Sequence, residues 1–136
     1  MQETAIDMVY PGVLTKFFHS DIAARMKQAD RNGKLRKESQ FVVGIPAREM
    51  NKADSDALIL LQGIIYAWFT EDDGLVLVHY KSDRVKEGGE NILLDRYQIQ
   101  LFYYAKALTQ ITGKKVKEAV IYSLALQKEI PVPINL

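Results

Sequence analysis

The sequence contains no cysteine, which excludes disulfides, thiolate zinc sites and cysteine-ligated iron–sulfur clusters. It also lacks any apolar run near the roughly 18 residues that a membrane span needs, and its first residues do not follow the basic-then-apolar order of a signal peptide. Charge of the two signs is nearly balanced, at +1 overall, so the total charge predicts no polyanionic partner. These absences favour a cytoplasmic location and predict no membrane partner.

The composition that remains is that of a globular domain. The chain has 136 residues, of which 48% are hydrophobic, and this is enough to bury one core. We expect residues 1–136 to form a single domain in which residues 1–12 and 133–136 are peripheral. A local basic surface remains compatible with the balanced total charge.

Residues 58–84 are the stretch around which the rest is organised. Two apolar strands are predicted at residues 58–68 and 74–81, joined by an acidic turn at residues 71–74. The uninterrupted Val and Leu run at residues 75–78 is typical of a strand that is covered on both faces. It therefore favours a place in the middle of a sheet.

A lysine stands at the end of this central strand. Lys81 follows the apolar run at the point where the strand is expected to reach the surface, which is a place where a site could be built. The alternative is that Lys81 merely caps the strand end in water. Residue type alone favours that alternative, because lysine is rarely buried.

Two segments show the three- and four-residue spacing of apolar side chains that predicts an amphipathic helix. The first covers residues 13–28, although Ser20 could instead cap a second helix that begins near Ile22. The second covers residues 92–112, and Gly113 is expected to end it as a C-cap.

The other segments are expected to be strands and connections. Residues 38–46 and 117–126 are strand candidates, and residues 47–57 are a polar connection with room for one helical turn. Residues 129–136 are expected to trail off through two prolines. The order helix, three strands, helix, strand predicts a mixed α/β domain.

Six basic residues gather around a turn at residues 30–34. A solvated face is one interpretation of such a cluster, and a surface that tracks phosphates is the other. We favour the solvated face, because short loops are often charged. The residues are Arg25, Lys27, Arg31, Lys34, Arg36 and Lys37.

Three short motifs follow one another along the chain. Residues 62–65 read Gln-Gly-Ile-Ile, residues 80–84 read Tyr-Lys-Ser-Asp-Arg, and residues 100–104 begin with Gln and end with Tyr. In this order and spacing they resemble the RecB-like nucleases of the PD-(D/E)xK superfamily, in particular the C-terminal nuclease domain of AddA-type ATP-dependent helicase–nuclease subunits. The resemblance extends from about Phe17 to Val132.

This resemblance implies both a fold and a function. The implied fold is an α/β, restriction-endonuclease-like core, with a mixed central sheet flanked by helices and truncated at its N-terminal side. The implied function is that of a DNA exonuclease domain in a larger helicase–nuclease that acts in double-strand break repair. The implied partners are DNA, helicase domains of the same polypeptide and a second nuclease subunit, and the implied cofactor is Mg²⁺.

The chain departs from the family at the metal-binding positions. The family has an Asp after Gly-Ile-Ile and another before Tyr-Lys, where this chain has Tyr66 and His79. By resemblance, Lys81 remains as the catalytic lysine, and Gln100 and Tyr104 contact DNA or steady the site. A Gly-x-x-x-His motif, which supplies another metal ligand in the family, has no counterpart in this sequence.

Without the two carboxylates, the site is poorly suited to Mg²⁺, which prefers oxygen ligands. A phenol such as Tyr66 binds Mg²⁺ weakly, and an imidazole such as His79 suits Zn²⁺, Ni²⁺ or Cu²⁺ better. Asp83, which shares a side with Lys81 if the strand continues, and Glu38, at a strand start, are possible substitute ligands. We predict that Mg²⁺ binds poorly and that Mg²⁺-dependent cleavage is weak or absent.

Two other interpretations are compatible with the sequence. The chain could be a non-catalytic module that keeps the nuclease fold in order to bind DNA or to pack against other domains or subunits. Alternatively, the resemblance is coincidental, and Tyr66, His79 and Lys81 are then not neighbours. Each replaced position differs from an aspartate codon by one base, which fits natural decay of a site as well as deliberate inactivation.

Overall fold

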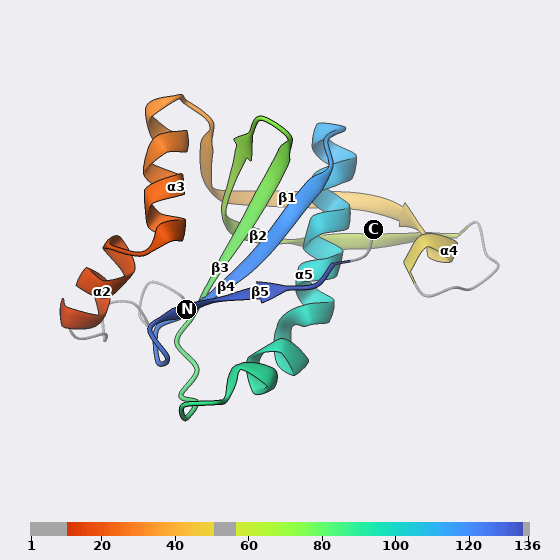
Figure 1. The fold of residues 1–136 in the computed structure, drawn as a ribbon. Coiled ribbons are helices and arrows are strands. Elements are labelled where there is room, and N and C mark those ends of the chain that lie inside the picture. The colour runs from red at the N-terminus through yellow and green to blue at the C-terminus, as the bar shows by residue number, and fades with distance from the viewer. Residues whose placement is uncertain (1–10, 51–56, 135–136) are drawn as a thin grey trace.

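The structure is a computed structural model that describes residues 11–50 and 57–134 (Figure 1). Over these residues the chain is α/β, as predicted, and five strands form one sheet in the order β1-β2-β3-β4-β5. Neighbouring strands are antiparallel except for β3 and β4, which are parallel and are connected through α5, so the sheet is mixed. The elements in chain order are α2 (Pro11–Phe18), α3 (Asp21–Arg31), β1 (Leu35–Pro46), α4 (Ala47–Met50), β2 (Leu58–Glu71), β3 (Gly74–Lys81), α5 (Glu90–Thr112), β4 (Val116–Ser123) and β5 (Lys128–Val132).

The central strand and its hairpin are confirmed. β2 and β3 pair as an antiparallel hairpin that closes at Glu71 and Gly74, with the two aspartates between them in the turn. β3 lies between β2 and β4, and the side chains of residues 75–78 have no exposed area. The apolar run is therefore covered on both faces, as its composition predicts.

The N-terminal helical segment is two helices, so the single helix expected at residues 13–28 is wrong and its alternative is confirmed. The Ser20 backbone is extended, and its Oγ accepts a hydrogen bond from the backbone N–H of Ala23 at 3.2 Å. The same hydroxyl donates to the Phe17 carbonyl oxygen at 2.6 Å. One serine thus ends α2 and caps α3.

The C-terminal segment also differs from the expectation. Residues 128–132 do not trail off: they form β5, which pairs with β4 and places Pro131 opposite Val120. A proline is tolerated there because β5 is an edge strand and needs no backbone donor on its free side. The preceding helix α5 does end at Gly113, which has φ of +71° as expected of a helix C-cap.

Some expectations concern residues that the structure does not describe. Of the segments expected to be peripheral, residues 1–10 and 135–136 lie outside the described residues. The predicted helical turn after β1 is confirmed as α4, while residues 51–56 also lie outside the described residues. None of the helices in the described part of the chain is long and apolar enough to cross a membrane.

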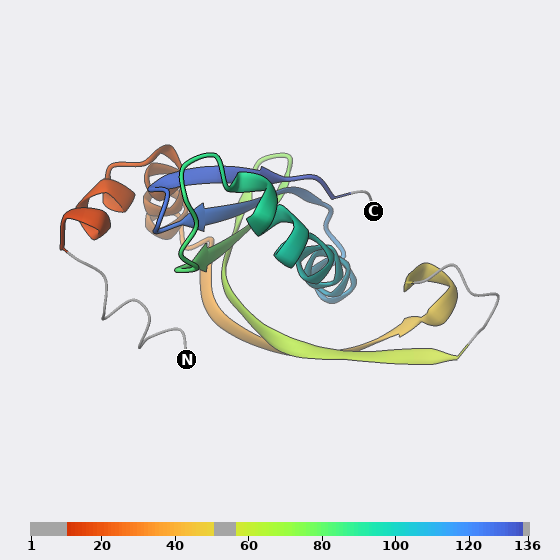
Figure 2. The same ribbon diagram turned by 90° about the horizontal axis from the view of Figure 1, so that it is seen from below.

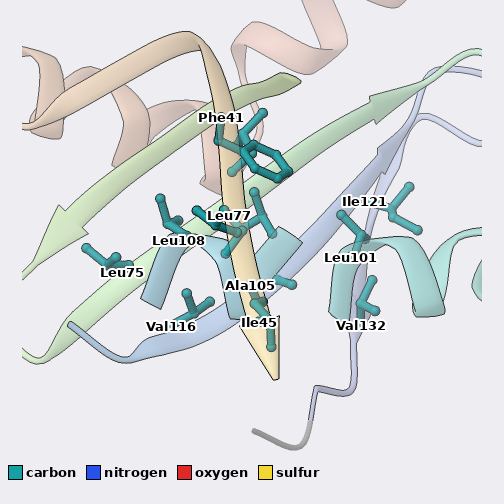
Figure 3. Packing of buried hydrophobic residues seen from close by; sticks show 14 of the residues in the cluster. Phe41, Ile45, Leu75, Leu77, Leu101, Ala105, Leu108, Val116, Ile121 and Val132 are labelled. Atoms are coloured by element: carbon teal, nitrogen blue, oxygen red, sulfur yellow. The ribbon is translucent and has the colours of Figure 1, made fainter. Parts of the chain in front are cut away.

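The sheet has a hydrophobic core on each face. The larger core lies between the sheet and α5, and Figure 3 shows side chains of β1, β3, β4, β5 and α5 meeting there. The smaller core joins the opposite face to α3 through Ile22, Met26 and Ala29. Seen from below, α3 and α5 lie in different places along the curved sheet (Figure 2).

The outer half of the β1–β2 hairpin, residues 40–46 and 58–64, is here called the arm. β2 pairs with β3 only from Ala67 onward, so in the arm β1 and β2 pair with each other alone. Figure 2 shows the arm curving away from the rest of the sheet, with α4 at its far end. One face of the arm packs towards α5, and the other exposes Val42, Leu58, Leu60 and Ile64.

Candidate functional site

The predicted site lies where β2 and β3 part. The last pair of the β2–β3 ladder is Ala67 with Val78, and the next residues along the two strands are Tyr66 and His79. Beyond this pair, β2 stays with β1, while β3 continues beside β4 as far as Lys81. Tyr66 and His79, which come from different strands, are thereby placed side by side, and this place in the sheet is here called the junction.

Three rings meet at this junction. The ring centroids of Tyr66 and His79 lie 5.9 Å apart with an interplanar angle of 61°, an edge-to-face contact. The ring of Tyr104, from α5, makes a similar contact with His79 at 5.9 Å. Tyr66 and His79 are therefore neighbours, whereas a coincidental resemblance predicts that they are apart.

His79 is held as a neutral imidazole. Its side chain is 2% exposed, and its buried Nδ1 has no hydrogen-bond partner among the described residues. Burial, together with the nearby positive charge of Lys81, lowers the pKa of His79 to about 3. At neutral pH the junction thus presents an uncharged ring at residue 79.

Lys81 is buried, so the interpretation that it caps the strand in water is wrong. It is 8% exposed, and its Nζ lies 4.0 Å from the centroid of the Tyr97 ring, within the range of a cation–π contact. Burial lowers the pKa of Lys81, and the negative charge of Asp83 partly opposes this shift. The face of the Tyr97 ring and the carboxylate of Asp83 both favour the charged form of the ammonium.

The two possible substitute ligands have different surroundings. β3 ends at Lys81, and the Asp83 Oδ2 beyond it accepts hydrogen bonds from Tyr97 Oη at 2.7 Å and Arg96 Nη1 at 2.9 Å. Burial opposes ionisation of Asp83, but these two donors outweigh it and keep the pKa of Asp83 below its usual value. Glu38 is exposed and lies at an irregularity of β1, with φ of +50°.

Gln100 and Tyr104 form the other half of the junction. Gln100 Nε2 donates a hydrogen bond to Tyr104 Oη at 3.1 Å, one helical turn away. The Tyr104 ring also meets Phe41 edge-to-face at 5.3 Å. A Cβ atom on Gly63 would lie 3.0 Å from Tyr104 Oη, so the glycine of the Gln-Gly-Ile-Ile motif allows this ring to approach the strand.

The described residues do not fit a magnesium site. Among them, no group of three or more His, Asp or Glu side chains is placed to hold a metal ion. The junction offers the neutral nitrogen of His79 and the phenol of Tyr66, with a buried ammonium nearby, and Mg²⁺ prefers carboxylate and water oxygens. No step of a reaction is therefore assigned to a metal here.

Tyr97 is a site residue whose role sequence reasoning did not find. It belongs to the apolar spacing of residues 92–112, yet its ring contacts Lys81 and its hydroxyl donates a hydrogen bond to Asp83. Its position three residues before Gln100 is the signal that could have placed it on the same side of the helix. Arg96, the second donor to Asp83, carried no comparable signal.

These observations define a class of protein. A mixed five-stranded sheet with helices on both faces, and a cluster of motif residues where two strands part, is consistent with a restriction-endonuclease-like core. No known protein-family model matches the sequence. Individual relatives do match it.

The relatives are A subunits of ATP-dependent helicase/nucleases. The chain is 37% identical to the A subunit of the ATP-dependent helicase/nuclease of Lachnoclostridium phytofermentans, over 97% of this chain and 12% of that relative. It is 42% identical to the protein of the same name from Clostridium perfringens (strain 13), over 88% of the chain and 10% of the relative. The corresponding values for Clostridium novyi are 35%, 93% and 10%.

By this similarity the chain is homologous to one segment of the ATP-dependent helicase/nuclease A subunits. It spans about a tenth of the length of these relatives. The resemblance that the motifs predict is thereby confirmed, while the activity of the whole protein is a separate matter.

Proposed function

We propose that this chain is the nuclease-type domain of a helicase–nuclease subunit that acts on DNA in double-strand break repair, and that its own Mg²⁺-dependent hydrolysis is weak or absent. The observation that carries this proposal is the meeting of Tyr66 and His79 beside Lys81 where β2 and β3 part. The protein partners that we propose are helicase domains of the same polypeptide and a second nuclease subunit.

The chemistry supports a weakened site. Phosphodiester hydrolysis needs a positioned water and neutralisation of charge on the phosphate, which one or two Mg²⁺ ions normally supply. A neutral His79 and the phenol of Tyr66 offer no negative charge to hold such an ion. Lys81 can still offset negative charge on a phosphate, and this part of the family chemistry remains.

A non-catalytic module that keeps the nuclease fold is the second candidate. It is favoured by the arm, whose exposed Val42, Leu58 and Leu60 side chains lie on a face that the described residues leave uncovered. In that case the fold would serve for packing against another domain or for holding DNA. Cleavage assays distinguish the two candidates.

The test compares the chain with its Tyr66→Asp/His79→Asp variant. Each is incubated with linear single- and double-stranded DNA and with Mg²⁺ or Mn²⁺, and products are resolved on gels. We expect no cleavage by the unmodified chain and measurable cleavage by the double variant, because the variant restores the two carboxylates. Calorimetric titration with Mn²⁺ should show binding by the double variant only.

Lys81→Met supplies the control. It keeps the length of the side chain and removes its charge, so it should abolish any cleavage that the double variant has gained without preventing folding. Rapid cleavage by the unmodified chain with Mg²⁺ as the only added ion, lost in Lys81→Met, would contradict the proposal. A double variant that binds Mn²⁺ but does not cleave would favour the non-catalytic module.

A further inference from the structure

We propose that a groove on the α3 side of the sheet binds a single strand of nucleic acid. The groove has a volume of about 210 Å³ and lies between α2, α3, β1 and β3. Tyr80 lines it, and because side chains alternate along a strand, it lies on the face of β3 opposite to His79 and Lys81. The inference rests on the proposed function only in taking DNA as a ligand, and its test is independent of cleavage.

An exposed aromatic ring stands at this groove on a rigid support. Phe18 is 53% exposed, and its ring centroid lies 5.5 Å from that of Phe17. Phe17 is fixed in turn by edge-to-face contacts with Tyr80 at 5.4 Å and Tyr122 at 4.8 Å. A nucleobase can therefore stack on Phe18 without displacing the rings that support it, and such stacking strengthens binding at least about fivefold per base.

Two amines stand at the same groove. Lys27, from α3, and Lys37, from β1, are both exposed and both line it. Among the described residues neither forms an ion pair, and the one hydrogen bond found for them is the long contact of 3.5 Å from Lys27 Nζ to the Phe18 carbonyl oxygen. Both charges are thus available to phosphates that flank a stacked base.

The structure divides the basic cluster that the sequence shows. The Arg25 guanidinium is bound by Glu71 and Glu118, with shortest distances of 2.8 Å and 2.6 Å, and its charge is neutralised there. Lys34 and Arg36 line a different pocket, beside Trp68 and Lys114. Of the six residues of this cluster, only Lys27 and Lys37 line the groove beside the aromatic ring, so the proposed contact is local.

An unpaired strand fits this combination better than a duplex does. Stacking on Phe18 requires a base whose face is free, and in a duplex both faces of each base are covered by neighbours. The groove also contains the carboxylate of Asp30, which opposes a polyanion and which should limit the affinity. An apolar protein segment would use Phe18 but not the two amines, and the test separates these cases.

The test uses fluorescence anisotropy with the full chain and a labelled oligothymidine of about 15 nucleotides, which covers the site sizes of single-strand binding domains. Phe18→Ala should weaken binding at least about fivefold, the lower end of the effect of one stacked base. Phe18→Trp should retain binding, and oligothymidine should quench the fluorescence of the new tryptophan. Asp30→Asn should strengthen binding.

The lysines are tested by salt dependence. Lys27→Gln/Lys37→Gln should lower the slope of log affinity against log salt concentration by about 1.4, since each phosphate contact on a single strand contributes about 0.7. Lys86→Gln/Lys114→Gln removes the same charge from exposed positions away from the groove and should leave the slope unchanged. Ile111→Ala, which removes another exposed apolar side chain, should leave the affinity unchanged.

Four results would overturn the proposal. One is the absence of binding by the unmodified chain, and another is an equal loss in the two lysine pairs, which would indicate non-specific attraction. The third is a Phe18→Ala variant that binds as the unmodified chain does. The fourth is a duplex of the same length that binds as tightly as the single strand. Far-ultraviolet circular dichroism confirms that each variant is folded.

Discussion

At the scale of single residues, His79 links the fold to the chemistry of the site. The imidazole fills a position between Tyr66 and Tyr104 and is almost fully buried. Burial and the nearby ammonium of Lys81 both keep the imidazole uncharged. Among the described residues, no carboxylate accepts a hydrogen bond from its Nδ1 and so offsets them. The charged form therefore belongs to the unfolded chain.

This difference between folded and unfolded chains predicts a pH dependence of stability. The pKa of His79 is about 3 when folded and about 6.5 when unfolded, so between these values the unfolded chain binds more protons. The contribution of neutral His79 is complete above pH 6.5 and is lost as the pH falls towards 3. Between pH 7 and pH 5 it should lower the free energy of unfolding by about 2 kcal/mol.

Urea unfolding at pH 7 and pH 5 measures this loss. His79→Leu removes the titrating group and keeps an apolar side chain, so its free energy of unfolding should change about 2 kcal/mol less between the two pH values. His19 is present in both proteins, and its contribution cancels in the comparison. Parallel pH dependences would show that the pKa of His79 is the same in the folded and unfolded chains.

The motifs predicted which residues form the junction but not how they are arranged. Tyr66, His79 and Tyr104 meet because strand register and helix packing bring these motif positions together. The burial of Lys81 was not predicted, since it depends on Tyr97 and Asp83, which come from α5 and from a loop. Residue type alone gives the average exposure of lysine and does not report such partners.

At the scale of elements, the approach of α5 to β2 depends on one glycine. The Tyr104 ring lies against the backbone at Gly63, where a methyl group would meet Tyr104 Oη at 3.0 Å and Phe41 Cε1 at 3.3 Å. Tyr104 is also held by Gln100 and by the ring of Phe41, so it cannot move away freely. An added methyl group must therefore displace a packed ring.

Gly63→Ala should lower the free energy of unfolding by about 1–2 kcal/mol, the usual cost of overpacking less the entropy gained by replacing glycine. In a Tyr104→Phe background the cost should be smaller, because the nearest clashing atom is gone. Gly44→Ala is the matched control: its methyl group would lie 3.4 Å from Leu58 Cδ1, an ordinary contact, and should be nearly neutral. Equal effects at both glycines would contradict this account.

Element boundaries were predicted less well than element types. The two helices α2 and α3 have one continuous apolar spacing, and only the Ser20 side chain separates them. β5 was missed because Pro131 indicates a break, while pairing with β4 makes the segment an edge strand. In both cases a tertiary or capping contact determines the element boundary, and the local spacing of apolar residues does not report that contact.

At the scale of the whole molecule, the sheet consists of two parts that differ in the number of paired neighbouring strands and covered faces. β3 has paired strands on both sides and a hydrophobic core on each face. The arm has one paired neighbour for each strand and one covered face, and its other face exposes Val42 and Leu60. A two-stranded ribbon of this kind depends on α5 for its stability.

Native-state hydrogen exchange should reveal this difference. Amides of residues 75–78 should exchange only by global unfolding, with rates that depend steeply on denaturant concentration. Amides of the arm should exchange by local opening, at least about 100-fold faster, because opening the arm exposes the apolar surface of one face only. Equal protection in the two regions would mean that the arm and the centre of the sheet unfold as one unit.

A single hydrogen bond offers a way to change one region and not the other. Gln110 Nε2, on the exposed side of α5, donates to the carbonyl oxygen of Gly44 at 2.8 Å and ties the helix to the arm. Gln110→Ala should remove about 1 kcal/mol from the free energy of arm opening and accelerate exchange there about fivefold. At residues 75–78 the exchange rate should rise only by the factor that the loss in the free energy of global unfolding accounts for. Acceleration of both regions by the same factor would show that the arm opens only when the whole sheet does.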